Sequence, residues 1–192
     1  MPESSEDVGI DVGLDGFVAL SNCKEIDNPR HFKRGLAHLV RAQRRLSRRK
    51  RGSHRCRKAA TLVAKAHRKI RNQRAAFHHD LSRWLVDRYG LIAMEDLNIK
   101  GLSRGILAGP IHDAGWNSFF TKLWYKAASA GRELVKVDPR GTSQICICGA
   151  AVPKTLAERW HECPVCGLSA PRNVVSAQVI LQRARVGVRG IT

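Results

Sequence analysis

Four of the chain's six cysteines form two close pairs, and each pair is followed by glycine. Cys146 and Cys148 make up the first pair, and Cys163 and Cys166 make up the second about fifteen residues later. Four thiolates at this kind of spacing can enclose Zn²⁺ in a tetrahedron, which predicts a structural zinc site. The first pair is one residue shorter than the usual C-x2-C spacing, so His161 is a candidate substitute ligand. A degenerate, metal-free knuckle is the alternative.

Two acidic positions interrupt or end apolar runs. Asp11 lies inside the run Val8–Gly13, and the run Leu91–Asp96 ends in Glu95 and Asp96. A carboxylate that emerges from a buried strand is costly unless a cation or hydrogen bonds compensate its charge. Asp11 is therefore a candidate for catalysis or metal binding. The alternative is a carboxylate that is hydrogen-bonded within a turn.

Basic residues are concentrated in residues 28–79, which contain 18 of the 34 Lys and Arg and no Asp or Glu. The other 16 basic residues match the 16 acidic ones, so this segment carries the whole formal net charge of +18. A pI near 10.6 and charge gathered in one segment are typical of proteins that bind nucleic acid. A solvated helix face is the alternative. The expected phosphate contacts in this segment are Arg44, Arg45, Arg48, Arg49, Lys50, Arg51, Arg55, Arg57 and Lys58.

The same segment has the periodicity of two long helices, because apolar residues recur at intervals of three or four positions. These residues are Leu36, Leu39, Val40 and Leu46, followed by Leu62, Ala66, Ile70, Phe77, Leu81 and Leu85. Gly52 and Ser53 separate the two halves, and Ser53 is a candidate N-cap for the second helix. The sequence therefore predicts an antiparallel helical hairpin over residues 30–90, with an apolar seam inside and arginine outside.

Short apolar runs on either side of the hairpin predict a sheet. The predicted strands are Val8–Gly13, Phe17–Leu20, Leu91–Asp96 and Leu134–Asp138. The first two flank the turn Leu14-Asp15-Gly16 and are typical of a β-hairpin. Residues 98–109 contain three glycines and predict a flexible connector.

Two further helices are predicted. Trp116 to Ala130 has helical spacing, and Gly131 is its expected C′ residue. The residues of this helix that we expect in the core are Trp116, Phe119, Phe120, Leu123, Trp124 and Ala127. Pro171 to Arg185 predicts a closing helix, with Val175, Val179 and Leu181 on its apolar stripe.

Length and composition restrict the class of protein. The 192 residues suffice for one core and a small appendage, and a hydrophobic content of 43% excludes wholesale disorder. No apolar run approaches the roughly 20 residues that span a bilayer. Residues 1–7 are acidic and polar, unlike a secretory signal. We therefore expect an intracellular protein that does not bind membranes, with thiols that are reduced or metal-bound.

The order of these features resembles the nuclease half of the TnpB (OrfB) proteins of bacterial insertion sequences, which are relatives of the type V CRISPR effectors. The resemblance runs from about Val8 to Leu181. The matching stretches are Gly9–Leu14, Asn28–Arg30, Arg44–Ser47, Asn72–Arg74, Met94–Asn98, Asp113–Trp116, Val137–Arg140, Thr142–Gln144 and the cysteine pairs. It implies an α/β fold, namely an RNase H-like (RuvC) mixed sheet with a long basic helical hairpin and a small zinc ribbon as insertions. The implied units are a core at 8–140 that includes the hairpin, a zinc ribbon at 141–170 and a closing helix at 171–187.

In that family, three carboxylates hold two Mg²⁺ ions that promote in-line cleavage of a DNA strand. The resemblance places Asp11 at the first catalytic position and Glu95 at the second, so both are expected magnesium ligands. The third position belongs to an Asp-Arg-Asp-x-Asn-Ala pattern, where this chain has Asn173 in place of the acid. An amide brings no charge to a hard cation, which predicts weak or lost activity. The other acids near these positions are Asp96, Asp113 and Asp138.

The resemblance implies DNA and guide RNA as partners, and it adds Arg74 and Arg172 to the expected nucleic-acid contacts. It also implies an N-terminal lobe that is missing from this sequence, which either a second chain or a longer form of this protein would supply. Three functions are then open: a nucleic-acid-binding member with impaired catalysis, an active Mg²⁺-dependent RNA-guided DNA endonuclease, or a non-functional transposon remnant. The shortened cysteine pair, the lost acid and the missing lobe favour the first and the third over an active nuclease. The expected location is the bacterial cytoplasm, in association with the nucleoid.

Overall fold

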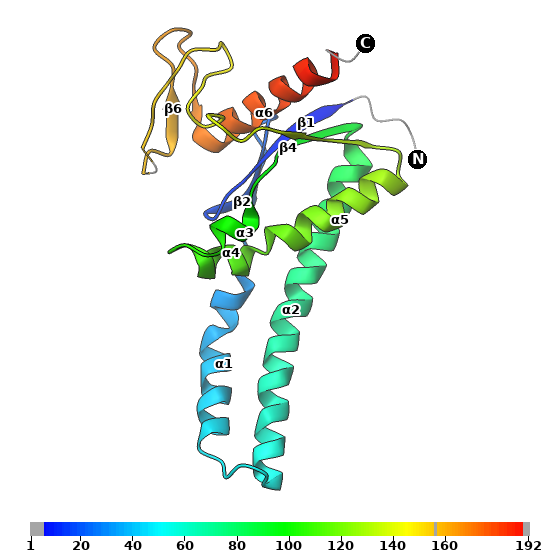
Figure 1. Cartoon of the computed structure of the whole chain (residues 1–192), viewed down its shortest axis with the longest axis vertical. Helices are drawn as coiled ribbons and strands as arrows, with labels where there is room; N and C mark the ends of the chain where they lie inside the picture. Colours follow the sequence, from blue (N-terminus) through cyan, green and yellow to red (C-terminus); the bar gives the residue numbers. More distant parts are fainter. Residues whose placement is uncertain (1–5, 156, 190–192) are drawn as a thin grey trace.

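A mixed sheet of five strands lies at the centre of the computed structural model, which describes residues 6–155 and 157–189 (Figure 1). The strands are β1 (Asp7–Val12), β2 (Gly16–Leu20), β3 (Glu25–Asp27), β4 (Leu91–Glu95) and β5 (Glu133–Val137). Their order is β3-β2-β1-β4-β5; β2 is antiparallel to β1 and β3, whereas β1, β4 and β5 are parallel. The four predicted strands are confirmed, and the short strand β3 has no apolar run that predicts it.

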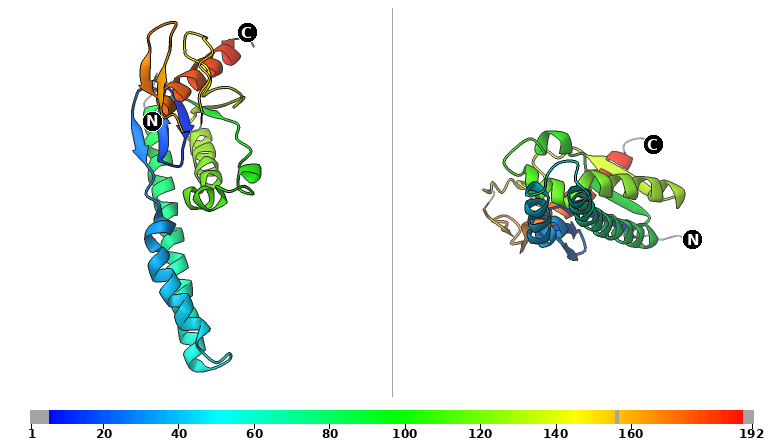
Figure 2. Two further views of the ribbon diagram at one scale, coloured as in Figure 1. Left: turned by 90° about the vertical axis from the view of Figure 1, so that its left-hand side faces the viewer. Right: turned by 90° about the horizontal axis from the view of Figure 1, so that it is seen from below.

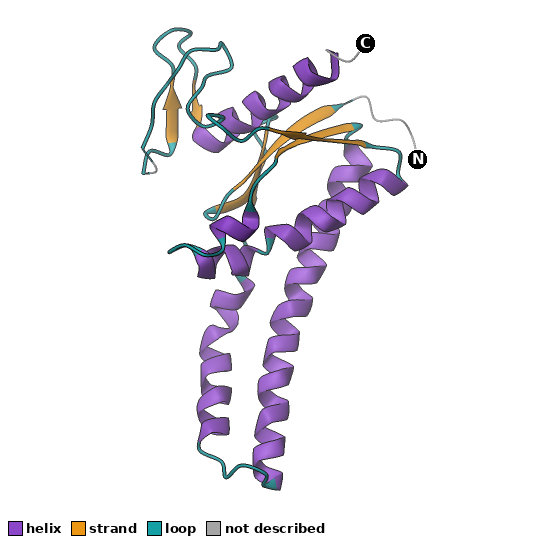
Figure 3. Cartoon of the chain, viewed as in Figure 1, coloured by secondary structure: helices purple, strands orange, loops and turns teal. Residues whose placement is uncertain are grey.

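Helices cover both faces of this sheet (Figure 3). The helices of the described chain are α1 (His31–Ser47), α2 (His54–Arg88), α3 (Ile99–Leu102), α4 (Ala108–Ala114), α5 (Trp116–Ser129) and α6 (Arg172–Arg189), of which α2, α5 and α6 pack on the sheet. On one face, α2 and α5 pack around buried Phe17 and Phe119. On the other face, α6 packs through Ile180 against Ala93 of β4. None of the described helices is long and apolar enough to cross a membrane. Of the acidic stretch 1–7, residues 1–5 lie outside the described part of the chain.

β1 carries a glycine where α6 crosses it. A Cβ atom added to Gly9 would lie only 2.0 Å from the carbonyl oxygen of Ala177 in α6. No side chain fits into that space, so the crossing requires glycine. The close approach brings the start of α6, which carries Asn173, to the end of β1, which carries Asp11.

α1 and α2 form an antiparallel hairpin that projects away from the sheet (Figure 2). Leu39 of α1 packs against Ala66 and Ile70 of α2 in a buried seam, as predicted. The prediction that Leu36 and Leu62 also lie in this seam is wrong, because each is 41% exposed. Two helices that pack only against each other bury a narrow stripe, so apolar residues at its margins stay in contact with solvent.

The helix ends agree with the local signals. Ser53 caps α2, because its Oγ accepts a hydrogen bond from the Cys56 amide at 3.1 Å. Gly131 follows α5 with a φ of 64°, as expected of a C′ residue. The closing helix begins at Arg172, directly after β7 (Ser169–Pro171). Local capping chemistry therefore accounts for where these helices begin and end.

Two predictions for residues 98–130 are wrong. The expected flexible connector contains α3 and part of α4, and Trp124 is 53% exposed instead of buried. Asn98 supplies the missed signal, because its side chain accepts a hydrogen bond from the Gly101 amide and caps α3. Leu123 points into the core, so Trp124 lies about 100° further round the helix and faces solvent.

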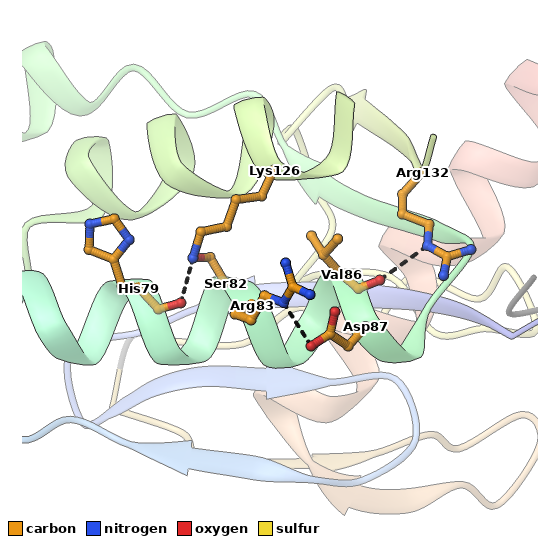
Figure 4. A network of polar contacts seen from close by, with 7 residues as sticks. All are labelled: His79, Ser82, Arg83, Val86, Asp87, Lys126 and Arg132. Carbon is orange, nitrogen blue, oxygen red and sulfur yellow. Dashed lines mark hydrogen bonds and ion pairs between the residues drawn. The ribbon is translucent and has the colours of Figure 1, made fainter. Parts of the chain in front are cut away.

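Polar contacts fix α5 against α2 (Figure 4). The Lys126 ammonium donates to the His79 carbonyl oxygen at 2.6 Å and to Ser82 Oγ at 2.9 Å. Arg132 Nε donates to the Val86 carbonyl oxygen at 3.1 Å. These contacts tie the end of α2 to the core, so the hairpin projects from a fixed base.

Asp113 of α4 caps the start of α1. Its carboxylate accepts hydrogen bonds from the amides of Phe32 at 2.8 Å and Lys33 at 3.2 Å. We expect Asp113→Ala to reduce the free energy of unfolding by about 1 kcal/mol and the Tm by about 2–4 °C, as followed by circular dichroism. Asp80→Ala on α2 should change little. A changed metal affinity with an unchanged Tm would contradict the capping role.

Candidate functional site

Asp11, Glu95 and Asn173 converge on one cleft with a volume of about 1070 Å³. Asp11 lies near the end of β1, Glu95 is the last residue of β4, and the two strands are parallel neighbours. Ile10 pairs with Met94, so the two carboxylates occupy adjacent positions at one edge of the sheet. Asn173 enters the cleft from the first turn of α6. The structure therefore brings together all three positions that the sequence singled out.

Burial outweighs the basic groups that act on the two carboxylates, Arg172 on Asp11 and Arg183 on Glu95. Burial raises the pKa of Asp11 from 3.8 to about 8; the charge of Glu95 adds to this shift and Arg172 opposes it. Burial also raises the pKa of Glu95, while a hydrogen bond from the Thr142 hydroxyl to Oε1 lowers it. A cation in the cleft would stabilise both anionic forms.

In the described part of the chain, no third carboxylate takes the place of Asn173. Its Nδ2 lies 3.5 Å from a Cβ built on Gly13, so the amide sits beside the end of β1. Within residues 6–155 and 157–189, only the four cysteines form a group of three or more His, Cys, Asp or Glu residues placed to hold one ion. The nearby acids have other partners: Asp96 accepts from Lys136, Asp113 caps α1, and Asp138 accepts from the Arg140 amide.

Because its pKa is raised, Asp11 lowers the free energy of unfolding at neutral pH. The carboxyl group keeps its proton in the folded chain up to about pH 8 but loses it near pH 4 when unfolded. The native protein should therefore lose stability as pH rises from about 4 to 8. We expect Asp11→Asn, which cannot ionise, to be more stable without metal by up to about 4 kcal/mol at pH 7 and to have a Tm higher by up to about 8–16 °C.

Calorimetry across this pH range tests the prediction. Asp27→Asn, in the exposed strand β3, serves as the control and should keep the native pH dependence. The prediction is wrong if the Tm of Asp11→Asn at pH 7 is equal to or below that of the native chain. Groups of the protein would then stabilise the ionised carboxylate of Asp11 in the folded state.

Basic side chains line the rim of the cleft, namely Arg30, Lys33, Lys154, Arg159 and Arg172. Arg159 pairs with Asp15 at 2.6 Å, and Arg172 Nη1 donates to the Thr155 carbonyl oxygen at 3.2 Å. Arg30 has a left-handed backbone with a φ of 48°. Of these five basic residues, only Arg172 was predicted to contact nucleic acid. The signal that could have found Arg30, and also Thr142 beside Glu95, is that both lie in stretches that carry the family resemblance. The rim suits an anionic ligand.

The four cysteines bring their sulfur atoms within 4.8 Å of one another. The sulfurs of Cys146 and Cys166 are 3.6 Å apart, and those of Cys148 and Cys163 are 3.7 Å apart. Four thiolates at about 2.3 Å from a tetrahedral zinc ion have sulfurs about 3.8 Å apart, so the geometry fits this ion. A hydrogen bond from the Cys166 amide lowers the pKa of Cys163 to about 6, whereas burial raises the pKa of Cys146 to about 12, so an ion that bound here would have to displace the proton of Cys146.

The short spacing of the first pair does not prevent this convergence. In the first knuckle the Gly149 amide donates to the Cys146 carbonyl oxygen at 2.9 Å, and in the second the Gly167 amide donates to that of Cys163 at 3.0 Å. Both glycines have a positive φ, 87° and 74°. The first knuckle thus closes the same kind of turn with one residue fewer, because glycine tolerates this backbone.

His161 is buried in β6 (Trp160–Glu162) and does not belong to the group of converging ligands. Its Nδ1 is hydrogen-bonded to the ammonium group of Lys154. Lys154 also donates to the Ser143 carbonyl oxygen at 3.2 Å. The four cysteines converge without His161, so it is not a substitute ligand in this structure.

The basic residues expected to bind nucleic acid fall into three places. Those at the hairpin tip are all exposed: Arg44, Arg45, Arg48, Arg49, Lys50, Arg51, Arg55, Arg57 and Lys58. Arg74 lies at the base of the hairpin, where its Nη1 donates to the His112 carbonyl oxygen at 2.7 Å. Arg172 lies in the cleft. The structure does not bring Arg74 together with the tip residues.

Comparison with known sequences places these features in a family. Residues 1–105 match the OrfB_IS605 family, described as "Probable transposase", and residues 116–180 match the Cas12f1-like TNB domain. A Streptomyces pristinaespiralis protein named "Putative RNA-guided DNA endonuclease" is 36% identical over 98% of this chain and 49% of its own length. Escherichia coli K12 InsQ, with the same description, is 29% identical over 93% of this chain and 49% of its own length. The chain therefore spans about half the length of these relatives.

Two solved structures share the fold. One is the "CRISPR-Cas12f Ternary Complex", with a TM-score of 0.67 and 19% identity over 94% of this chain and 40% of that one. The other is the "Cas12f1-sgRNA-target DNA complex", with a TM-score of 0.64 and 18% identity over 94% of this chain and 50% of that one. The OrfB_IS605 match alone covers more than half of the chain. The chain thus belongs to the OrfB (TnpB) family of transposon-associated proteins, relatives of the RNA-guided DNA endonucleases.

Proposed function

We propose that this chain is the RuvC-like, RNase H-type half of a TnpB-family protein that binds nucleic acid but has an impaired cutting centre. In this proposal residues 8–140 form the core, 141–170 the zinc ribbon and 171–187 the closing helix. The hairpin arginines bind phosphates, and the partners are DNA and guide RNA. The names and titles of the relatives support these partners, because they describe RNA-guided endonucleases and a complex with guide RNA and target DNA.

The observation that carries the proposal is the composition of the cleft. Asp11 and Glu95 supply the two carboxylates at the ends of β1 and β4, and the third position is the neutral amide of Asn173. The two other acids that line the cleft have partners in the protein, because Asp15 pairs with Arg30 and Arg159 and Asp113 caps α1. Mg²⁺ prefers anionic oxygen ligands in a strict octahedral arrangement. Two divalent ions carry four positive charges, so two carboxylates leave their mutual repulsion poorly compensated. The residues present fit one ion held by Asp11 and Glu95, but they do not fit a two-ion centre.

The same proposal assigns a structural Zn²⁺ to Cys146, Cys148, Cys163 and Cys166. Such an ion would join the two knuckles and stabilise the loop between them. That loop carries Arg159, whose guanidinium pairs with Asp15 at the rim of the cleft. The ion would therefore act on the cleft only through the position of this segment.

An RNA-guided activity like that named for the relatives would need residues that this sequence does not contain. The relatives are about twice as long, so the remaining half, in this protein or in a second chain, would have to supply guide binding. An active endonuclease is the second candidate, and the presence of both Asp11 and Glu95 in the cleft favours it over a remnant without function. In a bacterial cell we expect the protein at the nucleoid.

Salt-dependent binding tests the proposal. We expect the chain to bind DNA with an affinity that falls steeply with salt, with a slope of about 5 or more in log Kd against log salt, because many phosphates are neutralised. Fluorescence anisotropy with labelled DNA measures this, and a nuclease assay with Mg²⁺ or Mn²⁺ runs in parallel. Salt-insensitive binding would contradict the role of the arginines. Efficient cleavage by the native chain that Asp11→Ala abolishes would favour the active endonuclease.

A further inference from the structure

The carboxylate of Glu95 is held by a residue of a distant loop. The hydroxyl group of Thr142 donates a hydrogen bond to Glu95 Oε1, and Thr142 Oγ1 also lies 3.1 Å from the carbonyl oxygen of Pro139. A hydroxyl group has one proton, and an ionised carboxylate is a stronger acceptor than a carbonyl group. The proton therefore goes to Glu95 whenever Glu95 carries its charge.

This bond fixes a side chain that its own strand leaves free to rotate. Glu95 is the last residue of β4, and the pairing of β4 with β5 fixes only its backbone. The side chain has three rotatable bonds between the backbone and the carboxylate. Thr142 is 3% exposed and lines the same cleft, so its hydroxyl group is shielded from water. The bond from Thr142 thus sets the direction of the carboxylate.

Arg183 of α6 holds the loop that carries Thr142. Its Nη1 donates to the carbonyl oxygen of Asp138 at 2.7 Å and to that of Arg140 at 2.9 Å. Gly141 follows with a φ of 72°, a backbone that favours glycine, and leads directly into Thr142. One guanidinium group therefore ties two carbonyl groups of this loop to α6.

A purely structural role for Thr142 is the alternative, in which its hydroxyl satisfies only the Pro139 carbonyl oxygen within the turn. Two observations favour a role toward Glu95. Burial opposes the charge of Glu95, so this carboxylate is not placed there for stability, and the Thr142 hydroxyl favours the charged form that binds a cation. The contacts also run in one direction, from Arg183 through the loop to Thr142 and then to Glu95.

We propose that Thr142 is a positioning residue for Glu95, and that Arg183 keeps Thr142 in place by holding the loop before it. In this arrangement α6 carries one position of the cleft, Asn173, and sets another through the loop. Groups that hydrogen-bond to a metal ligand typically change the affinity of the site by 10- to 100-fold. This inference rests on the proposed function, because it takes Glu95 as a ligand of the one ion that the cleft fits.

Two substitutions at position 142 separate the hydroxyl group from the shape of the side chain. Thr142→Val removes the hydroxyl and keeps the volume, whereas Thr142→Ser keeps the hydroxyl. Mn²⁺ is titrated into each protein and followed by electron paramagnetic resonance, and the ion that Asp11→Ala removes is the one in the cleft. We expect Thr142→Val to weaken its binding by about tenfold or more and Thr142→Ser to stay within about threefold of the native chain. Thr121→Val, which removes a hydroxyl bonded to the Asn117 carbonyl oxygen within α5, should change nothing.

The sign of the effect separates position from charge at Arg183. Arg183→Gln removes a positive charge that acts on Glu95, and by charge alone this would tighten the binding of a cation. We expect binding to weaken instead, by about threefold to tenfold. Adding Arg183→Gln to Thr142→Val should cost little more, because both act through one contact. Arg185→Gln, two residues later on α6, breaks a pair with Asp7 and should keep the native affinity.

A second measurement reports the position of Glu95 without any metal. In a chain labelled with ¹³C-glutamate, nuclear magnetic resonance relaxation gives the order parameter of the Glu95 Cγ methylene group, which Glu95→Gln assigns. This order parameter should be high in the native chain and in Thr142→Ser. It should fall to about 0.6 or below in Thr142→Val and in Arg183→Gln.

Native Mn²⁺ affinity and an unchanged order parameter in Thr142→Val would overturn the inference, and so would tighter binding by Arg183→Gln. Equal losses of affinity in Thr142→Val and Thr142→Ser, together with a lower Tm, would show a structural role only and would overturn it as well. In these cases the cleft still binds its ion and the proposed function survives. If the native chain binds no ion that Asp11→Ala removes, the one-ion cleft of the proposed function is refuted, and the order parameter alone decides whether Thr142 positions Glu95.

Discussion

Asn173→Asp should raise Mg²⁺- or Mn²⁺-dependent cleavage of single-stranded DNA by roughly 10²–10⁴-fold over the native chain. The substitution restores a third negative charge beside Asp11 and Glu95 without changing the shape of the side chain. It therefore compensates the repulsion between two divalent ions, which the amide leaves in place. A gel assay with purified protein, DNA in excess and each metal in turn measures the rate.

Two further variants separate this explanation from simpler ones. Gln144→Glu adds the same charge at an exposed position on the rim of the cleft, and it should leave the rate unchanged. Asn173→Asp combined with Asp11→Ala should be as inactive as Asp11→Ala alone. If Asn173→Asp gains nothing while its fold and its DNA binding are intact, the lost acid is not the reason for low activity.

Loss of zinc should unfold the ribbon and leave the sheet folded. Cys163→Ser removes one of four ligands, and zinc-dependent modules of this size do not bury enough apolar surface to fold without the ion. We expect zinc content to fall from one ion per chain to none. Hydrogen exchange in residues 141–170 should become as fast as in an unfolded chain, whereas β1, β4 and α6 stay protected.

Cys23→Ser and Cys56→Ser provide the matched controls, because both cysteines lie outside the cluster. Each should retain zinc and the native exchange pattern. Plasma emission spectroscopy on protein purified without chelator gives the metal content. A native chain without zinc, whose residues 141–170 are nevertheless protected, would establish the metal-free knuckle instead.

Features that depend on neighbouring residues could be predicted from the sequence. The cap of α2 at Ser53 and the C′ residue Gly131 follow from local chemistry, and both are present. The four predicted strands follow from short apolar runs. The missed helix α3 depends on a local signal as well, because Asn98 caps it; the glycines nearby pointed to a connector instead.

Features that depend on tertiary contacts could not be predicted in this way. The hydrogen bond from Thr142 to Glu95 joins residues 47 positions apart, and no spacing rule indicates it. The exposure of Leu36 follows from the narrow contact between two helices, although its periodicity alone favours the seam. The cysteines could be recognised from their spacing. Their convergence despite the short first pair depends on the backbone at Gly149.

The most direct test of the impaired centre is the number of Mn²⁺ ions that the native chain binds in the cleft, counted by electron paramagnetic resonance with bound DNA. We predict no more than one weakly held ion, which Asp11→Ala removes. Asn173→Asp should bind two ions whose spins couple. Two tightly bound, coupled ions in the native chain, with DNA turned over, would contradict the account.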